Sequence, residues 1–241
     1  MGWDHAYARP LEEGRLVKRY KRFLADIELA DGSVLTVHCP NPGSMKSCSS
    51  PGSRVRISDS KNPKRKLRHT LEQIQIGRTW VGVNTAVPNP AVAAAIARGA
   101  IPGLDGYETI EREVPDGRAS RFDLRLLGSG APCWIEVKNT TLREDGEARF
   151  PDAKTERGRK HLGALAELVR DGARAVQVFV VSRGDVRVFR PAWDIDPAYA
   201  EALTDAVREG VEAIAIRARY DARGARLTDT LPIDLGAPTT A

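Results

Sequence analysis

Two carboxylates and an amine on neighbouring strand-like segments are the residues best suited to chemistry in this chain. Asp123 lies in the run 120–127, and Glu136 and Lys138 lie in the run 133–139. Two apolar runs joined by a short glycine-containing turn predict an antiparallel hairpin. Because side chains alternate along a strand, Glu136 and Lys138 share one face, and Asp123 can approach that face from the partner strand.

Such a group could hold a divalent cation for phosphodiester hydrolysis, with the lysine orienting or polarising the attacking water. A solvated strand face with a cross-strand ion pair would contain the same residues, and Glu-x-Lys is a short, common pattern. Glu136 follows Trp134 and Ile135 in an apolar run, where an unpaired charge is costly. A cation shared with Asp123, or a pair with Lys138, would offset that cost.

Composition restricts the class of protein. The chain has 241 residues, of which 41% are hydrophobic and 29% charged, enough for a folded core in one large domain or two modest ones. No apolar run is long enough to span a bilayer, and the first residues lack the features of a signal peptide. The odd number of cysteines favours a cytoplasmic location. His38, Cys39 and Cys48 could supply zinc ligands, but their spacing matches no common site.

Positive charge is concentrated near the N-terminus. Residues 1–80 contain 15 Lys and Arg against 8 Asp and Glu, a net charge of +7, whereas the remaining residues contain 22 against 24, a net charge of −2. The excess favours a polyanion such as DNA over simple solubilising surface charge. The candidate nucleic-acid contacts in this part of the chain are Arg19, Lys64, Arg65, Lys66 and Arg68.

Residues 1–85 read as a domain of short strands separated by turns that contain glycine or proline. Five or so strands in this length favour a small OB-like β-barrel, a fold that commonly binds single strands through basic loops and aromatic platforms. Tyr20, Phe23 and Trp80 could be such platforms, although each could equally be a core residue.

Residues 86–241 read as an α/β layer domain. After a polar loop at 142–151, Asp152 is the predicted N-cap of a helix over 153–170. The last ten residues are expected to fray. The other predicted elements are a helix at 91–98, a strand at 108–114, a strand at 175–181, a helix from 197 to about 209 and a strand at 211–218.

Several segments, in order, resemble the sugar fermentation stimulation protein A family. They are 37–45, 62–66, 83–85, 120–123, 135–139, 150–153 and 157–162. The resemblance implies an N-terminal OB-type domain followed by an α/β domain similar to PD-(D/E)xK nucleases, and a DNA-binding protein. In one departure, Pro42 stands where the family usually has threonine, which removes a hydroxyl from the first domain.

The resemblance also implies roles for individual residues. Asp123 and Glu136 match metal ligands for Mg²⁺ or Mn²⁺, and Lys138 completes the catalytic motif. Glu113 is similar to an additional acidic ligand that precedes the hairpin, and Lys160 to a polar helix residue that faces the site.

On the helix that contains Lys160, helical spacing places Arg157 with Lys160 and His161 along one side, where Arg157 could hold a phosphate backbone. A solvated face is the alternative for these basic groups, and we interpret His161 as a packed histidine rather than a general base.

The sequence therefore predicts a DNA-binding protein whose second domain is a Mg²⁺-dependent nuclease. The alternative is a non-catalytic DNA-binding regulator, acting on the expression of sugar-metabolism genes, that uses the nuclease fold only as a platform. A carbohydrate-handling role is suggested by the family name alone, and no residue supports it. We expect no membrane partner.

Overall fold

Alternating apolar residues in the first third of the chain build a β-barrel. Residues 2–117 and 120–237 are described in the computed structural model. The barrel sheet consists of β2 (Glu12–Tyr20), β3 (Leu24–Glu28), β4 (Val34–His38), β5 (Arg54–Asp59), β6 (His69–Ile76) and β7 (Thr79–Gly82). It closes where β4 pairs with β6, His38 opposite Thr70. Buried side chains such as Leu16, Ile27 and Val55 fill its core. The predicted OB-like barrel is confirmed.

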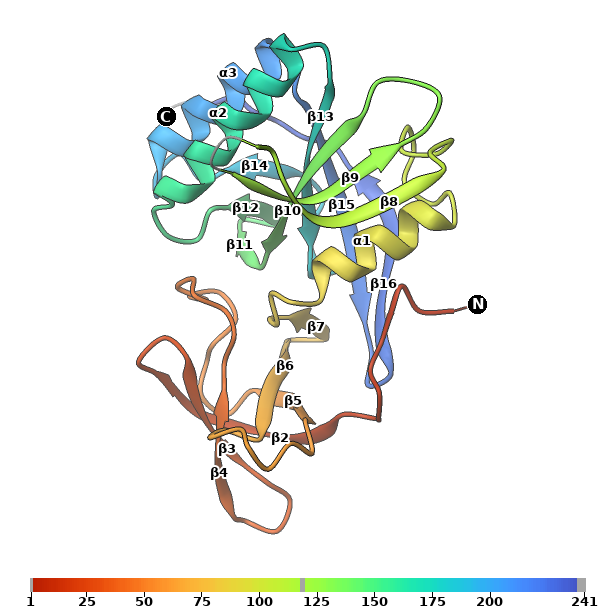
Figure 1. The fold of residues 1–241 in the computed structure, drawn as a ribbon. Coiled ribbons are helices and arrows are strands. Elements are labelled where there is room, and N and C mark those ends of the chain that lie inside the picture. The colour runs from red at the N-terminus through yellow and green to blue at the C-terminus, as the bar shows by residue number, and fades with distance from the viewer. Residues whose placement is uncertain (1, 118–119, 238–241) are drawn as a thin grey trace.

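A seven-stranded sheet forms the centre of the second domain, in the order β1-β16-β15-β13-β10-β9-β8. Figure 1 shows this sheet and its helices stacked on the barrel. Its strands are β1 (His5–Ala6), β8 (Thr109–Pro115), β9 (Arg121–Leu127), β10 (Cys133–Thr140), β13 (Arg174–Val181), β15 (Glu212–Tyr220) and β16 (Gly224–Leu231). β9 and β10 pair antiparallel, as the sequence predicts, whereas β10, β13 and β15 run parallel.

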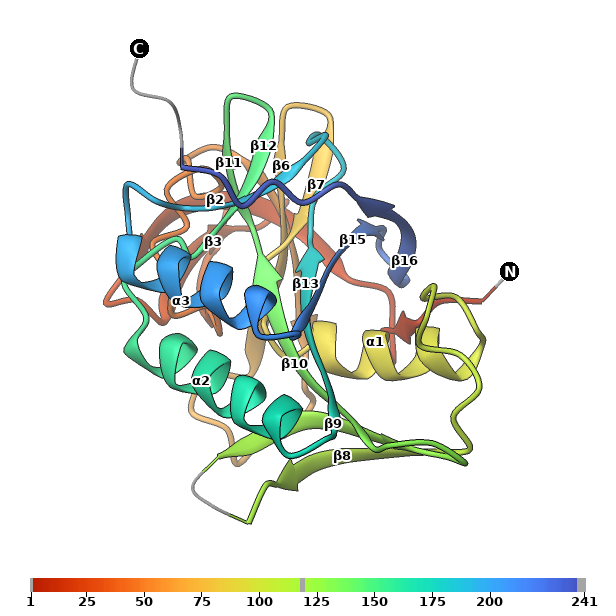
Figure 2. The same cartoon turned by 90° about the horizontal axis from the view of Figure 1, so that it is seen from above.

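Helices cover both faces of the central sheet, which makes an α/β layered domain (Figure 2). Helix α1 (Pro88–Ala97) packs on the face formed by Ile135 and Val137. Helices α2 (Glu156–Arg170) and α3 (Pro197–Arg208) pack on the opposite face. Within the described ranges, no helix is long and apolar enough to cross a membrane.

The first residues of the chain join the second sheet instead of the barrel. Strand β1 pairs with β16, and the carboxylate of the buried Asp4 binds the guanidinium of Arg98 at the end of α1. This part of the range 1–85 therefore lies in the sheet of the second domain. The barrel sheet ends at Gly82, and α1 begins at Pro88.

The prediction of a polar loop at 142–151 is wrong. This segment forms a hairpin of β11 (Leu142–Glu144) and β12 (Glu147–Phe150), and β12 pairs with β14 (Phe189–Pro191). Asp145 and Gly146 make the two-residue turn, both with positive φ. An Asp-Gly pair between short strands is a strong hairpin signal. The strands were not predicted because the residues on either side of this pair are mostly polar.

The predicted helix at 153–170 begins later, at Glu156. Thr155 is its N-cap and accepts a hydrogen bond from Gly158 N at 3.1 Å. Asp152 lies three residues before this cap, and its carboxylate instead accepts a hydrogen bond from Met45 N in the barrel domain, at 3.0 Å. The short strand β14 and the strand β16 were not predicted, since their sequences lack a clear apolar alternation.

Gly82 lies at the contact between the two domains, where there is no space for a side chain. Gly82 N donates to Ser182 O at 2.9 Å, and a Cβ at Gly82 would overlap the phenol ring of Tyr220. The end of β7 therefore lies directly against β13 and β15 of the second domain.

The substitution Gly82→Ala is expected to destabilise the protein by about 1–3 kcal/mol, because the buried ring of Tyr220 must shift. Gly163→Ala is the matched control, since Gly163 lies in α2 and a methyl group added there would meet nothing within 4 Å. Alanine there should stabilise the helix by about 0.5–1 kcal/mol. Urea unfolding midpoints measure both, and equal effects of the two substitutions would contradict the tight contact.

Candidate functional site

Asp123 on β9 lies beside the β10 residues that the sequence analysis paired with it. Leu124 and Ile135 are the last residues paired between β9 and β10, and Asp123 lies just beyond this pair. Its Oδ2 accepts a hydrogen bond from Val137 N at 2.7 Å, and its Oδ1 accepts one from Asn89 Nδ2 at 2.5 Å. Strand β10 and the first turn of α1 thus fix this carboxylate.

Glu136 is almost completely buried, with 3% of its surface exposed. Its Oε1 accepts hydrogen bonds from Lys138 Nζ and from His161 Nδ1, the latter at 2.5 Å. The predicted pair of Glu136 with Lys138 is therefore present. The other oxygen, Oε2, is buried with no hydrogen-bond partner in the described chain. An unpartnered carboxylate oxygen in the interior is costly unless a cation or a donor reaches it.

The two carboxyl groups differ in their affinity for protons. Burial, followed by the negative charge of Glu136, raises the pKa of Asp123 to about 6. Burial also disfavours the ionised form of Glu136, but the hydrogen bond from His161 and the charge of Lys138 outweigh it and hold the pKa of Glu136 below its usual value. Glu136 is thus the more acidic of the two carboxyl groups, and Asp123 is the one that accepts a proton more readily.

His161 is the site residue whose role the sequence analysis missed. It packs on Phe122 with a ring-centroid distance of 6.0 Å, as expected for a packed histidine, but it also holds Glu136. Arg157 Nε donates to His161 Nε2 at 3.4 Å, which leaves Nδ1 as the ring nitrogen that donates to Glu136. The spacing of four residues between Arg157 and His161, on one face of α2, was the available signal.

A cavity of about 500 Å³ opens over these groups, and both domains line it. The second domain contributes Asn89, Asp123, Glu136, Lys138, Lys154 and Arg157, among others. The barrel domain contributes Arg22 and the loop 41–43, including Pro42. The candidate site therefore lies between the domains, with the carboxylates on one side and a loop of the barrel on the other.

Arg19 holds that loop in place. Its guanidinium donates to the carbonyl oxygens of Asn41, Gly43 and Ser44 at 2.9, 2.8 and 3.2 Å. These bonds occupy the guanidinium of Arg19 within the protein, which makes it less available for the nucleic-acid contact predicted from the sequence. A Cβ at Gly43 would overlap the carboxylate of Asp152, so the loop lies directly against the second domain.

Two predicted site residues are not brought to the cavity. Glu113 lies on β8 between the pairs Arg112–Leu124 and Val114–Phe122, and it is exposed with a φ of 53°. Lys160 has 73% of its side chain exposed and pairs with Glu156 at 3.1 Å. Lys160 points away because the buried side of α2 passes through His161, one residue further along the helix.

The predicted basic cluster lies between β5 and β6, outside the cavity. Lys64 and Lys66 are exposed, and neither makes an ion pair with the described residues. Arg68 binds the carboxylate of Asp59 through two nitrogens at 2.6 and 2.5 Å, and Arg65 donates to Thr70 Oγ1 at 3.3 Å. Lys64 and Lys66 are thus the members most available to a polyanion.

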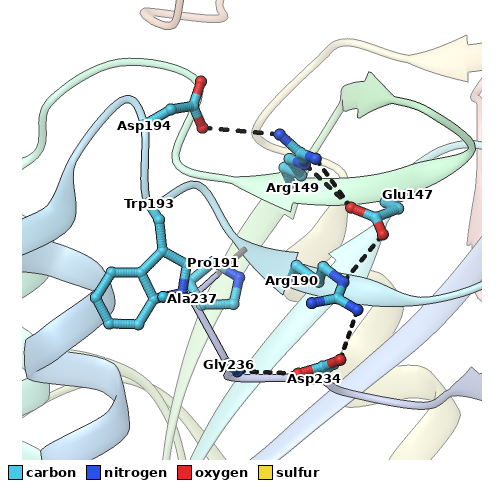
Figure 3. Close-up of a pocket in the computed structure, with 9 residues that line it drawn as sticks. All are labelled: Glu147, Arg149, Arg190, Pro191, Trp193, Asp194, Asp234, Gly236 and Ala237. Atoms are coloured by element: carbon cyan, nitrogen blue, oxygen red, sulfur yellow. Dashed lines mark hydrogen bonds and ion pairs between the residues drawn. The ribbon is translucent and has the colours of Figure 1, made fainter. Parts of the chain in front are cut away.

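A second hollow, of about 380 Å³, lies beside β12 and β14 (Figure 3). Its two guanidinium groups are already paired with acids, as the dashed lines show. Arg149 binds Glu147 at 3.0 Å, and Arg190 binds Glu147 at 3.0 Å and Asp234 at 2.6 Å. Because these charges satisfy one another, this hollow is a weaker candidate for chemistry than the interdomain cavity.

The donor set of the interdomain cavity fits a hydrated divalent cation. Mg²⁺ keeps several waters and commonly takes only one or two protein carboxylates. Asp123 and the unpartnered Oε2 of Glu136 would supply these ligands. Across residues 2–117 and 120–237, no group of three or more His, Cys, Asp or Glu side chains could hold a metal by itself. A cation here would therefore need water or substrate oxygens, and the zinc alternative at His38, Cys39 and Cys48 finds no support.

Comparisons with known proteins agree with this division of the chain. The model of the SfsA N-terminal OB domain matches residues 17–83, and the model of the sugar fermentation stimulation protein RE domain matches residues 86–224. A sugar fermentation stimulation protein homolog of Geobacter sulfurreducens is 53% identical over 95% of this chain and 98% of its own. A homolog of Acidithiobacillus ferrooxidans is 53% identical over 87% of this chain and 91% of its own.

A solved structure has the same arrangement of elements. SfsA of Pyrococcus furiosus, determined in complex with Ca²⁺, is 25% identical and superposes with a TM-score of 0.87. The match covers 97% of this chain and 100% of the other.

Asp123→Asn is expected to stabilise the metal-free protein at pH 8 by about 1–3 kcal/mol. The pKa of Asp123 is higher in the folded protein, about 6, than its usual value of 3.8, so its ionisation destabilises the fold as the pH rises through this interval. The advantage of the variant should therefore disappear as the pH falls from 6 towards 4. Chemical unfolding in chelator at several pH values measures it.

The same experiment with added divalent cation separates charge from metal binding. Mg²⁺ or Ca²⁺ should stabilise the wild-type protein more than the Asp123→Asn variant, because a ligand of the folded state stabilises it by mass action. A variant that is less stable than wild type in chelator at pH 8 would contradict the unfavourable burial of this carboxylate.

Proposed function

Because this chain belongs to the sugar fermentation stimulation protein family, we propose that it binds DNA and hydrolyses phosphodiester bonds with a divalent cation, Mg²⁺ or Mn²⁺. The observation that carries the proposal is the juxtaposition of Asp123, Glu136 and Lys138 at one cavity, with Glu136 Oε2 left without a partner. Two carboxylates and an ammonium group around an open cavity are what metal-assisted hydrolysis requires.

Each residue has a distinct part in this proposal. Asp123 and Glu136 would hold the cation, which supplies positive charge for the scissile phosphate and lowers the pKa of water. Lys138 carries a proton-donating ammonium group beside Glu136, where it can orient the water that attacks phosphorus as the bond to the leaving oxygen breaks. Asn89 and His161 would fix the carboxylates, since each donates a hydrogen bond to one of them.

The bound Ca²⁺ of the Pyrococcus furiosus relative supports a divalent cation in this fold. Ca²⁺ and Mg²⁺ are both hard cations that prefer oxygen ligands, which this cavity offers. Arg22, Lys154 and Arg157 line the same cavity and could bind the phosphates on either side of the cut. A cytoplasmic location remains an expectation, consistent with the three buried, free cysteines.

The non-catalytic regulator remains the second candidate because of one specific observation. Oε1 of Glu136 is already held by Lys138 and His161, so the site has internal partners even without a metal. Such a site could persist as a positively flanked platform that binds DNA without cleaving it.

Cleavage of labelled DNA distinguishes the two candidates. With Mg²⁺ or Mn²⁺, the wild-type protein is expected to cleave, and Asp123→Asn and Lys138→Met should each lose on the order of 10²-fold or more of the rate. Arg208→Ala is the control, since Arg208 is exposed on α3 and pairs with the neighbouring Asp205 at 3.1 Å, away from the cavity. Binding without cleavage in any divalent metal would support the regulator instead.

The charge of the β5–β6 loop makes a separate prediction. If Lys64 and Lys66 contact phosphates, the double substitution to alanine should weaken DNA binding for all sequences. It should also flatten the slope of log K against log salt by roughly 1–2, because fewer counterions are released. Fluorescence titrations at several salt concentrations measure the slope. The control is the double substitution of Arg170 and Arg208 to alanine, which also removes two exposed positive charges. A slope equal to that of the wild type would exclude this loop from the interface.

A further inference from the structure

Phe23 is an exposed aromatic residue that directly follows a lining residue of the candidate site in the chain. Among the described residues, the exposed large apolar side chains are Val17, Phe23 and Val34, and Phe23, 43% exposed, is the aromatic one. It follows Arg22, which lines the cavity that contains the carboxylates. An aromatic ring left in water, one residue away from the cavity lining, is available to a planar ligand.

The backbone presents Phe23 in a fixed position. Lys21 and Arg22 both have positive φ, 47° and 65°, a conformation that non-glycine residues rarely adopt. Phe23 N donates to Lys21 O at 2.7 Å, and Phe23 O accepts from Cys39 N at 2.8 Å. Strained turns held by such hydrogen bonds tend to occur at functional positions, and this turn aims a ring at solvent.

His38 supports the ring from the neighbouring strand. The rings of Phe23 and His38 stack with a centroid distance of 6.5 Å and an interplanar angle of 28°. Burial, followed by the charge of Arg65, lowers the pKa of His38, so the imidazole is neutral at pH 7. Two uncharged, nearly parallel rings form a platform of the kind on which nucleobases stack.

The other two aromatic residues of the barrel, Tyr20 and Trp80, are partly buried, and each has a cation over its ring. The guanidinium of Arg56 lies 3.8 Å from the centre of the Trp80 ring. Lys18 Nζ lies 5.2 Å from the ring centre of Tyr20, and the Tyr20 hydroxyl is bonded to Asp26. Of the three aromatic residues that the sequence suggested as platforms, Phe23 is therefore the most exposed and the best placed for stacking.

We propose that Phe23, supported by His38, stacks an unpaired base of a DNA strand whose backbone passes Arg22 into the cavity. This inference rests on the proposed binding of DNA and specifies its substrate class, a strand that is single or locally unpaired. In duplex DNA every base face is already stacked on a neighbour, so the ring would have nothing to bind. Stacking of one base on an aromatic side chain contributes about tenfold in affinity.

The test compares two labelled duplexes that differ in one nucleotide. The first is fully paired, and the second has a single bulged 2-aminopurine, whose fluorescence falls when it stacks on a ring. Binding is measured by anisotropy with Ca²⁺ present, and the wild-type protein should prefer the bulged duplex by about tenfold. An abasic nucleotide at the bulge should remove that preference, because the backbone distortion remains while the stacking base is absent.

Phe23→Ala should lose the preference and the fluorescence quenching but keep its affinity for the paired duplex. Phe23→Tyr should retain both, and Val34→Ala, at 61% exposure, is the matched control for loss of an exposed apolar side chain. Because Phe23 is exposed, its truncation should leave the unfolding midpoint near that of the wild type.

The outcomes also separate this inference from the proposed function. No preference in the wild type, or a preference that survives Phe23→Ala, would overturn the platform while DNA binding stands. A preference that depends on Phe23 without cleavage in any metal would remove the nuclease but keep the platform. Failure of the wild type to bind either duplex would remove both.

Discussion

A carboxylate buried between strands and a helix is the constraint on which the candidate site depends. Glu136 can remain ionised at 3% exposure because Lys138 and His161 both bind its Oε1. Lys138 lies on β10 and His161 on α2. The ionised form of Glu136 therefore depends on the packing of this helix on the sheet. Oε2 of Glu136 has no hydrogen-bond partner among the described residues, and a bound cation would compensate its charge.

The second domain alone does not enclose the site. The barrel loop 41–43 forms the facing wall, Arg19 fixes its carbonyl groups, and Asp152 receives the hydrogen bond from Met45 N. Removing water from around charged groups strengthens their interactions, and this wall narrows the space that water can fill. The barrel therefore contributes to the electrostatics of the cavity in addition to any binding surface of its own.

The fold, and the proximity of Asp123 to Glu136 and Lys138, could be predicted from the sequence because they depend on local patterns. The alternation around Glu136 and the turn before β10 predicted that Asp123, Glu136 and Lys138 lie close together. The change from short strands to alternating strands and helices near residue 85 predicted the order of the domains. Contacts between segments far apart in the sequence could not be predicted in this way. Nothing local indicates that Asp152 binds the barrel domain, that Arg19 turns inward, or that Glu113 and Lys160 remain outside the cavity. The role of His161 depends on α2 packing over β10, which no single segment encodes.

The pairing of β1 with β16 has a consequence for movement between the domains. The chain begins in the central sheet, leaves it to build the barrel and returns through β7 to α1. The barrel is therefore an insertion held by two connections, where a domain on a single linker could rotate about one hinge. Two anchors restrict large rigid-body swings, since both segments would have to bend together. We expect a ligand to enter through the opening of the cavity between two domains that keep their relative orientation. Only side chains and loops should adjust, without closure of one domain onto the other.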